Sequence, residues 1–317
     1  MIEKIVNVAT GILTRDDGKI LLGNRPEGKS WAGWWEFPGG KLEPGETALQ
    51  ALNRALSEEL GIKTVKAYPW ITYVYFYPKS AVRLTFFRII QWIGNPVGLE
   101  NQFLKWFKPC EIYQKNKLLP AIYSSLKWLK LPRHYGITSI QSPIKLNYFL
   151  KRLDRALRSG LKLIQFREPS WPDGTDSESL LLVLEEVVRR CHKLNAMVLI
   201  NSMHPKLWWE KANGVHLQSH DAKKNFIKSE NSLLCMSTHN HLDLIRARYL
   251  NADFAVLGPV LKTPTHPKGK EIGWKEFSER IKNLGIPVFA LGGQSEQTQE
   301  DAYQHGAHGI AGIRFLI

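Results

Sequence analysis

Adjacent glutamates end one helix-forming stretch of this 317-residue sequence, and further glutamates stand in the turn before it. Glu58 and Glu59 stand together at the end of the stretch 47–60. Glu46 precedes Arg54 by about two helical turns, so we expect an ion pair that orients the preceding loop. Clustered carboxylates bind hard divalent cations such as Mg²⁺, which in turn hold phosphate oxygens. The pattern favours attack of water on a pyrophosphate, with the metal neutralising the developing charge.

The full spacing of this segment resembles the Nudix box, the signature of a family of hydrolases. Its residues are the series Gly40-x5-Glu46-x7-Arg54-x-Leu56-x-Glu58-Glu59-x-Gly61-Ile62, preceded by Trp35-Glu36-Phe37-Pro38-Gly39-Gly40-Lys41. With that leading segment it is similar to the MutT branch, which cleaves oxidised purine nucleoside triphosphates to monophosphates and pyrophosphate. The resemblance covers roughly residues 1–130 and implies an α/β/α sandwich around a mixed sheet.

The resemblance also implies roles for individual residues. It implies that Glu58, Glu59 and the carbonyl of Gly39 bind Mg²⁺, or Mn²⁺ in its place, with Glu100 as a further ligand on a loop. The catalytic residues that it implies are Arg54, Glu58, Glu59 and Glu100. The substrate contacts that it implies are Arg25, Glu36 and Gly40.

Two positions depart from the family pattern. Ala55 stands directly after the arginine, where the motif has a glutamate that is implicated as the general base in MutT-type enzymes. Loss of a general base costs about 10²–10⁴-fold in rate. Glu100 or another loop carboxylate is the expected replacement, and the sequence does not decide between them. Ile122 replaces an asparagine that reads the purine edge, and its side chain cannot form hydrogen bonds, so we expect weak discrimination for 8-oxoguanine.

Polar residues follow a series of short apolar stretches in the second half of the sequence. Eight such stretches, most of them separated by helical ones, predict a parallel sheet closed into a compact (β/α)8 barrel. Active sites of such barrels lie at the carboxyl ends of the strands, and the paired glycines near the last strands are expected to cradle a phosphate. The residues expected at those ends are Gln165, Arg167, Asn201, His216, Asp221, Ser237, His239, Thr263, Thr265, Gly292 and Gly293.

The order of these residues resembles the thiamine phosphate synthase/TenI family over residues 134–317. The family's lysine after the Arg-Glu pair is Pro169 here, its acidic residues after the third strand are Ser202-Met203, and its lysine after the two threonines is His266. These losses argue against efficient synthase activity and favour a ligand-binding, isomerising or purely structural barrel. The resemblance implies that Asp221 approaches Mg²⁺. It implies substrate contacts at Gln165, Arg167, Asn201, Thr263, Thr265 and Gly293.

Periodicity predicts the elements that must position these residues. In the first half it predicts strands over 4–13, 19–24, 71–77 and 83–92, and helices over 47–60 and 118–129. In the second half it predicts strands over 135–138, 161–166, 197–200, 214–217, 233–236, 254–257, 288–291 and 310–313, and helices over 177–194, 241–250, 274–284 and 296–305. The predicted class is α/β with two domains, 1–130 and 134–317.

The net charge of +14 is shared between the two halves. Residues 1–130 hold 18 basic and 11 acidic side chains, and the remainder holds 25 and 18. This even distribution argues against a polybasic membrane anchor, and no nucleic-acid-binding motif is present, so we expect the charge to steer small polyphosphates. The absence of a signal-peptide pattern or spanning apolar run, together with three widely spaced cysteines, predicts a cytoplasmic protein with reduced thiols. The oligomeric state stays open.

The sequence favours the first of three functions. The first is Mg²⁺-dependent hydrolysis of a nucleoside triphosphate such as 8-oxo-dGTP, in which the protein would cleanse the nucleotide pool. The second is binding of a nucleotide or a phosphorylated thiamine precursor without turnover, because both sites have lost family residues. The third is thiamine phosphate synthase activity in the barrel.

Overall fold

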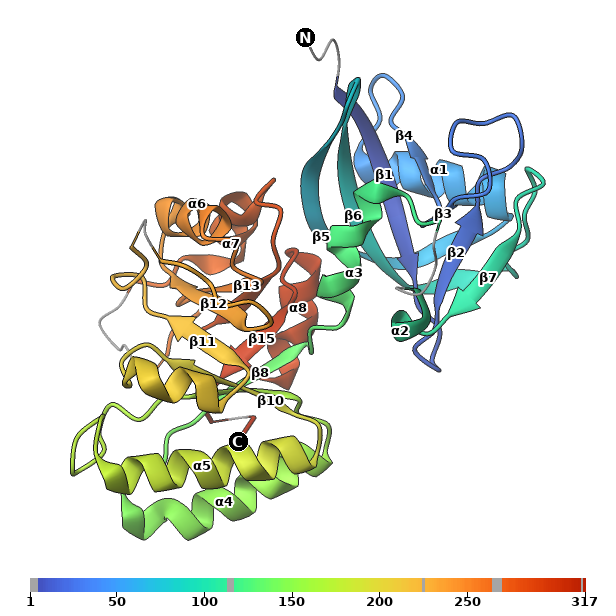
Figure 1. The fold of residues 1–317 in the computed structure, drawn as a ribbon. Helices are drawn as coiled ribbons and strands as arrows, with labels where there is room; N and C mark the ends of the chain where they lie inside the picture. Colours follow the sequence, from blue (N-terminus) through green and yellow to red (C-terminus); the bar gives the residue numbers. More distant parts are fainter. Residues whose placement is uncertain (1–4, 113–116, 224–225, 264–269, 315) are drawn as a thin grey trace. The chain divides into compact units, whose positions relative to one another are not determined.

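The computed structural model describes residues 5–112, 117–223, 226–263, 270–314 and 316–317. Contacts divide the chain into two compact units, Met1–Leu131 and Pro132–Ile317. Strands form the centre of each unit, and helices lie outside them (Figure 1). The predicted two-domain α/β class is confirmed. None of the helices in the described ranges combines the length and the hydropathy needed to cross a membrane.

A mixed four-stranded sheet, in the order β4-β1-β6-β5, forms the larger layer of the first unit. Strand β1 pairs in parallel with β6 and antiparallel with β4, while β5 and β6 form an antiparallel hairpin. A second sheet has the order β3-β2-β7. The strands are β1 Ile5–Leu13, β2 Ile20–Asn24, β3 Trp35–Glu36, β4 Gly39–Lys41, β5 Lys63–Tyr77, β6 Ser80–Ile93 and β7 Leu104–Phe107.

Alternation along β6 gives the sheet of the first unit two buried faces. Phe87 and Ile89 point to the face that packs against helix α1. Phe86 points to the opposite face, where its ring contacts Trp70, and Trp70 in turn contacts Trp128 of helix α3. Helices therefore cover both faces, as the predicted sandwich requires. The helices of this unit are α1 Ala48–Leu60, α2 Pro109–Ile112, the 3₁₀ turn η1 Pro120–Ile122 and α3 Tyr123–Leu129.

Eight parallel strands close into a barrel in the second unit, in the order β10-β11-β12-β13-β14-β15-β8-β9. Short strands buried along their whole length read as continuous apolar stretches, which is why the sequence predicts them within a few residues. The strands are β8 His134–Ile137, β9 Leu163–Phe166, β10 Met197–Asn201, β11 Gly214–Leu217, β12 Leu233–Thr238, β13 Phe254–Leu257, β14 Val288–Leu291 and β15 Gly309–Gly312.

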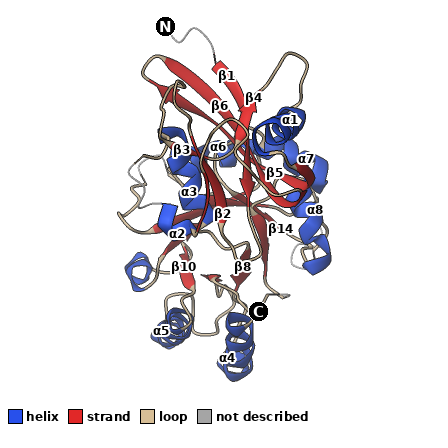
Figure 2. Ribbon diagram, turned by 90° about the vertical axis from the view of Figure 1, so that its right-hand side faces the viewer, coloured by secondary structure: helices blue, strands red, loops and turns tan. Residues whose placement is uncertain are grey.

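Helices surround the barrel, and α4 and α5 lie side by side outside strands β8 to β10 (Figures 1 and 2). Helix α4 buries Phe149, Leu150, Leu153 and Leu157, which recur at helical spacing between basic residues. The helices and 3₁₀ turns are α4 Pro143–Arg158, α5 Glu178–Lys193, η2 Lys206–Lys211, α6 His241–Tyr249, α7 Gly273–Ile281, η3 Glu296–Thr298 and α8 Gln299–Gln304.

Candidate functional site

Arg54 ties the glycine-rich loop of the first unit to the middle of helix α1. The helix begins after Thr47, which forms a reciprocal capping box with Gln50. The Arg54 guanidinium donates to both carboxylate oxygens of Glu46, from Nε at 2.8 Å and from Nη2 at 2.9 Å, and to the carbonyl of Lys41 at 3.0 Å. The hydrogen bonds from Arg54 lower the pKa of Glu46 to about 2. The predicted ion pair is therefore present, and it holds the loop on the helix.

The loop 94–103 folds back over the C-terminal end of helix α1. The last carbonyls of a helix lack partners inside the helix, and here the loop supplies them. The Leu99 amide donates to the carbonyl of Glu59 at 3.0 Å, and the side-chain amide of Gln102 donates to the same oxygen at 2.9 Å. Gln102 also accepts a hydrogen bond from the Glu100 amide at 2.8 Å. These bonds bring Glu100 to the helix end that carries Glu59.

Glu59 lies among other carboxylates. Its burial, followed by the charges of Glu100 and Glu36, raises its pKa to about 7. Lys29 opposes this shift from the loop between β2 and β3. A carboxyl group with this pKa is one whose surroundings disfavour negative charge, and a cation placed beside it reverses that preference.

The carboxylates at this end of α1 have cationic partners within the chain. Glu58 Oε2 lies 3.3 Å from Arg54, and Glu100 forms an ion pair with Lys29. Among the described residues no group of three acidic, histidine or cysteine side chains comes together as a metal cage. The donor set nevertheless consists of carboxylate oxygens that repel one another, and this chemistry fits a hard divalent cation.

The two charged residues expected to contact substrate in the first unit contact each other. Arg25 follows β2 and Glu36 lies in the neighbouring β3, so strand pairing brings them together. Arg25 Nη1 donates to both carboxylate oxygens of Glu36 at 2.9 Å, and its Nε donates to the carbonyl of Ser30 at 2.7 Å. Burial raises the pKa of Glu36, and Arg25 opposes the shift. Nearby, the Trp31 ring lies 6.0 Å from that of Tyr77 and is 43% exposed.

The four small or apolar positions of the first site are tightly packed. A Cβ on Gly39 would lie 2.1 Å from the carbonyl oxygen of Ala9, so only glycine fits there. A Cβ on Gly40 would lie 2.8 Å from the Cβ of Ala55, which is 2% exposed. Ile122 is likewise buried, at 3% exposed. Neither Ala55 nor Ile122 offers a polar side chain to a substrate.

A chain of hydrogen bonds crosses the C-terminal end of the barrel. Asn201 donates to Gln165 Oε1 at 2.9 Å, and Gln165 Nε2 lies 2.9 Å from His216 Nδ1. Tyr135 Oη also lies 3.0 Å from His216 Nδ1. Burial lowers the pKa of His216 to about 3, so the ring is neutral. A neutral ring that accepts at Nδ1 donates from Nε2, which lies 2.7 Å from Ser237 Oγ.

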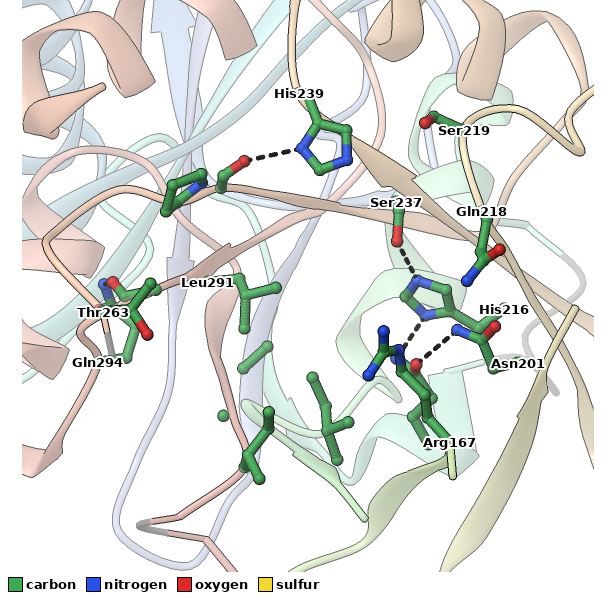
Figure 3. A pocket seen from close by; sticks show the side chains of 18 of the residues that line it. Arg167, Asn201, His216, Gln218, Ser219, Ser237, His239, Thr263, Leu291 and Gln294 are labelled. Carbon is green, nitrogen blue, oxygen red and sulfur yellow. Dashed lines mark hydrogen bonds between the residues drawn. The ribbon is translucent and has the colours of Figure 1, made fainter. Parts of the chain in front are cut away.

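Arg167 extends into a cavity of about 630 Å³ at this end of the barrel. Figure 3 shows Arg167 on the same side as Asn201, His216 and Ser237, with Thr263 on the other side. Burial lowers the pKa of Arg167. No side chain in the described ranges forms a hydrogen bond or a close ion pair with its guanidinium. A half-buried cation without such a partner favours an anionic ligand.

Asp221 does not line the cavity. Ser202 donates to Asp221 Oδ2 at 2.5 Å and accepts a hydrogen bond from the Gln218 amide at 2.9 Å. His220 Nε2 lies 3.5 Å from the other oxygen of Asp221. Asp221 is therefore hydrogen-bonded within its own chain, and its predicted approach to Mg²⁺ stays a prediction.

Paired glycines form the opposite wall of the cavity, after strand β14. Gly292 and Gly293 have φ values of 94° and 65°, and added Cβ atoms would lie 2.7 Å from Pro259 and 2.6 Å from Leu261. The pair is therefore packed directly against the loop that carries Thr263. Thr265, and likewise His266, lies outside the described residues. The cavity also brings together Gln165, Arg167, Asn201, His216, Ser237, His239, Thr263 and Gly293.

Five polar cavity residues escaped the sequence prediction. Arg314 stands two residues after the last barrel strand, and a strand-end rule applied to β15 finds it. The other four, Gln218, Ser219, His220 and Gln294, stand in loops just after strand ends, where residue type alone does not distinguish a ligand contact from an exposed side chain.

Comparison with known proteins finds a separate match for each unit. A family model described as "NUDIX domain" matches residues 5–129, and one described as "Thiamine monophosphate synthase" matches residues 134–316. A "Putative thiamine-phosphate synthase 2" of Aquifex aeolicus is 32% identical over 191 residues, which are 60% of this chain and 100% of that protein. An "8-oxo-dGTP diphosphatase" of Haemophilus influenzae is 42% identical over 106 residues, 33% of this chain and 78% of that protein.

A solved structure, the thiamine phosphate pyrophosphorylase from Pyrococcus furiosus, is 21% identical with a TM-score of 0.48. The match covers 57% of this chain and 85% of that one.

Proposed function

This chain belongs to the thiamine monophosphate synthase family through residues 134–316 and to the Nudix family through residues 5–129. We propose that it is a hydrolase joined to a phosphate-binding barrel. The first unit is a Nudix hydrolase that acts on nucleotides. Its substrate is a nucleoside triphosphate such as 8-oxo-dGTP, which it converts to the monophosphate and pyrophosphate. The observation that carries this proposal is the assembled Nudix box, in which Arg54 locks the glycine-rich loop and Glu59 lies beside Glu100.

A divalent cation, Mg²⁺ or Mn²⁺, would be held by Glu58, Glu59 and the carbonyl of Gly39, and it would supply charge neutralisation for the phosphate chain. In this proposal Glu100, which the sequence also offered as a metal ligand, stays free of the cation. Arg54 fixes the helix and the loop relative to each other, so it is a positioning residue for Glu58.

Glu100 is the residue that takes the proton in this proposal. Water attacks phosphorus, its proton passes to a Glu100 carboxylate oxygen, and the P–O bond to the leaving pyrophosphate breaks. Position 55 carries no acid, and the loop that carries Glu100 is fastened to helix α1 through Gln102. General-base catalysis contributes about 10²–10⁴-fold, which sets the size of the effect expected at Glu100.

A nucleotide panel tests the hydrolase. The full chain is incubated with Mg²⁺ and natural or oxidised nucleoside triphosphates, and released pyrophosphate is measured. We expect turnover that Glu58→Gln and Glu59→Gln abolish. Asp16→Asn, an exposed acid-to-amide change in the turn before β2, serves as the matched control and keeps full activity. Pyrophosphate release that is the same in Glu58→Gln as in the natural chain would overturn the proposal.

The barrel binds a small phosphorylated ligand of the thiamine-precursor class in this proposal. The cavity of about 630 Å³ and the half-buried Arg167 that lines it support this binding. Condensation of the pyrimidine pyrophosphate with the thiazole phosphate is the corresponding synthase assay. Because Pro169 and Ser202 replace a lysine and an acid of the family pattern, we expect binding of the thiazole phosphate and little condensation product.

A further inference from the structure

Lys29 joins the two loops that border the acidic end of helix α1. Its ammonium group donates a hydrogen bond to Glu100 Oε2, although 71 residues separate the two along the chain. Burial raises the pKa of Glu59 and of Glu36, and the positive charge of Lys29 opposes the rise at both. One ammonium group therefore balances negative charge at three carboxylates, as a divalent cation bound beside them would.

The loop 25–34, which carries Lys29, is closed at its base by backbone hydrogen bonds. The Arg25 amide donates to the carbonyl of Trp34 at 2.9 Å, and the Gly33 amide donates to the carbonyl of Arg25 at 2.9 Å. Lys29 stands near the middle of the loop, and its ammonium group is carried on a flexible four-carbon stem. The ammonium group is therefore able to move while the base of the loop stays closed.

The ion pair between Lys29 and Glu100 is of a kind that exchanges readily. The two side chains are 51% and 42% exposed, and exposed pairs contribute little to stability. A divalent cation on Glu58 and Glu59 has twice the charge of the ammonium group and repels it. The coupling is reciprocal, so Lys29 weakens metal binding by the same factor by which the metal weakens the ion pair.

We propose that Lys29 is an internal cation that occupies Glu100 until a divalent metal binds to Glu58 and Glu59. Metal binding releases the Glu100 carboxylate from Lys29, and the freed oxygen is then available to take the proton of the attacking water. The general base is thereby occupied in the empty site and exposed in the loaded one. This inference rests on the proposed hydrolase and adds to it an order of events, in which the metal precedes the base.

Titration of the full chain with Mn²⁺ alone tests the competition without any turnover, by calorimetry and by the electron paramagnetic resonance signal of free Mn²⁺. Glu59→Gln identifies the part of the binding that belongs to this site. We expect Lys29→Met to bind Mn²⁺ at this site about three- to tenfold more tightly than the natural chain, because a repelling charge is gone. Lys29→Arg keeps the charge and is expected to stay within about twofold of the natural chain.

Lys108→Met is the matched control for the loss of one positive charge. Lys108 is exposed and follows β7 at the end opposite to the loop 94–103, so we expect its replacement to leave Mn²⁺ affinity unchanged. Thermal unfolding of each variant confirms that it is folded before it is titrated.

Labelling of lysine amines with acetic anhydride, mapped by mass spectrometry, measures the release of Lys29 directly. We expect labelling of Lys29 to rise when Mn²⁺ is added, because Glu100 no longer shields the amine, while labelling of Lys108 stays the same. Equal Mn²⁺ affinity of Lys29→Met and the natural chain, or Lys29 labelling that Mn²⁺ leaves unchanged, overturns the inference. Metal-dependent pyrophosphate release alongside either result leaves the hydrolase standing, whereas absence of Mn²⁺ binding in both chains overturns the metal-dependent hydrolase as well.

Discussion

Gly40 and Ala55 bring strand β4 and helix α1 into direct contact: a Cβ on Gly40 would lie 2.8 Å from the Cβ of Ala55. The helix that carries Glu58 and Glu59 therefore rests on a strand without a side chain at the point of contact. Between Gly40 and Ala55 there is room for one methyl group, and the helix supplies it as the side chain of Ala55.

Moving that methyl group tests the contact. Gly40→Ala is expected to destabilise the first unit by about 1–3 kcal/mol through overpacking. In the double variant Gly40→Ala/Ala55→Gly the methyl moves to the strand, and we expect part of the stability to return, offset by about 1 kcal/mol for glycine in a helix. Urea unfolding measures both. A double variant less stable than the sum of the two single changes would contradict the contact.

The identity of the general base is tested at two positions in parallel. Glu100→Gln is expected to lower kcat by about 10²–10⁴-fold, because it removes the proposed proton acceptor. Ala55→Glu is expected to change kcat by less than tenfold, because the proposed base already lies on the loop. Steady-state kinetics with the best nucleotide of the panel gives both numbers. A hundred-fold activation by Ala55→Glu would mean that the chain lacks a working base.

The double hydrogen bond between Arg54 and Glu46 predicts that a lysine cannot replace the arginine. Lysine keeps the charge but loses the planar fork that reaches Glu46 and the Lys41 carbonyl together. We expect Arg54→Lys to reduce kcat by on the order of tenfold or more, since misplacing catalytic groups has large effects on rate. Arg15→Lys, at an exposed turn, is the control and leaves kcat unchanged. Equal activity of Arg54→Lys and the natural chain would exclude a positioning role.

The buried neutral ring of His216 predicts loss of barrel stability in acid. Its pKa is lowered by burial from 6.5 to about 3, so below pH 6.5 the unfolded chain takes up a proton that the folded chain excludes. The contribution of the neutral His216 ring to the free energy of unfolding is therefore fully present above pH 6.5. It is lost progressively as the pH falls towards 3. Thermal unfolding between pH 7.5 and 4.5 measures this slope in the natural chain and in His216→Asn. An identical slope in the variant would show that other groups cause the acid loss.

Elements with a strong local signal could be predicted from the sequence, and elements that depend on distant partners could not. Helix α1 has apolar residues at helical spacing and ends at Gly61 in the left-handed conformation, so both its type and its end were predictable. Strands β3, β4 and β7 have two to four residues and exist because they pair with β1 or β2. Helix α4 was not among the predicted helices, although its buried residues recur at helical spacing, so its signal was present in the sequence and was missed.

The same division holds for the candidate sites. Glu46 and Arg54 lie on one loop and the helix that follows it, so their spacing predicts the ion pair. The pair between Arg25 and Glu36 depends on the register of two strands, which composition does not specify. The sequence shows that Ser202 replaces an acid of the family pattern. The hydrogen bond from Ser202 to Asp221 could not be predicted, because it forms only when the barrel brings two loops together. The roles assigned to these residues in catalysis and binding stay predictions.

Three elements outside helix α1 supply charged side chains around Glu59: the loop 94–103 supplies Glu100, the loop between β2 and β3 supplies Lys29, and β3 supplies Glu36. Helix α1 itself supplies Arg54, Glu58 and Glu59. Helix α1 is constrained along its whole length: apolar side chains pack on one side, and the charged residues of the Nudix box occupy the other. The two loops carry far fewer packing constraints. Evolution can therefore change which nucleotide is accepted by exchanging loop residues while the helix stays the same, and a directed library confined to these loops would explore new substrates with little risk to the fold.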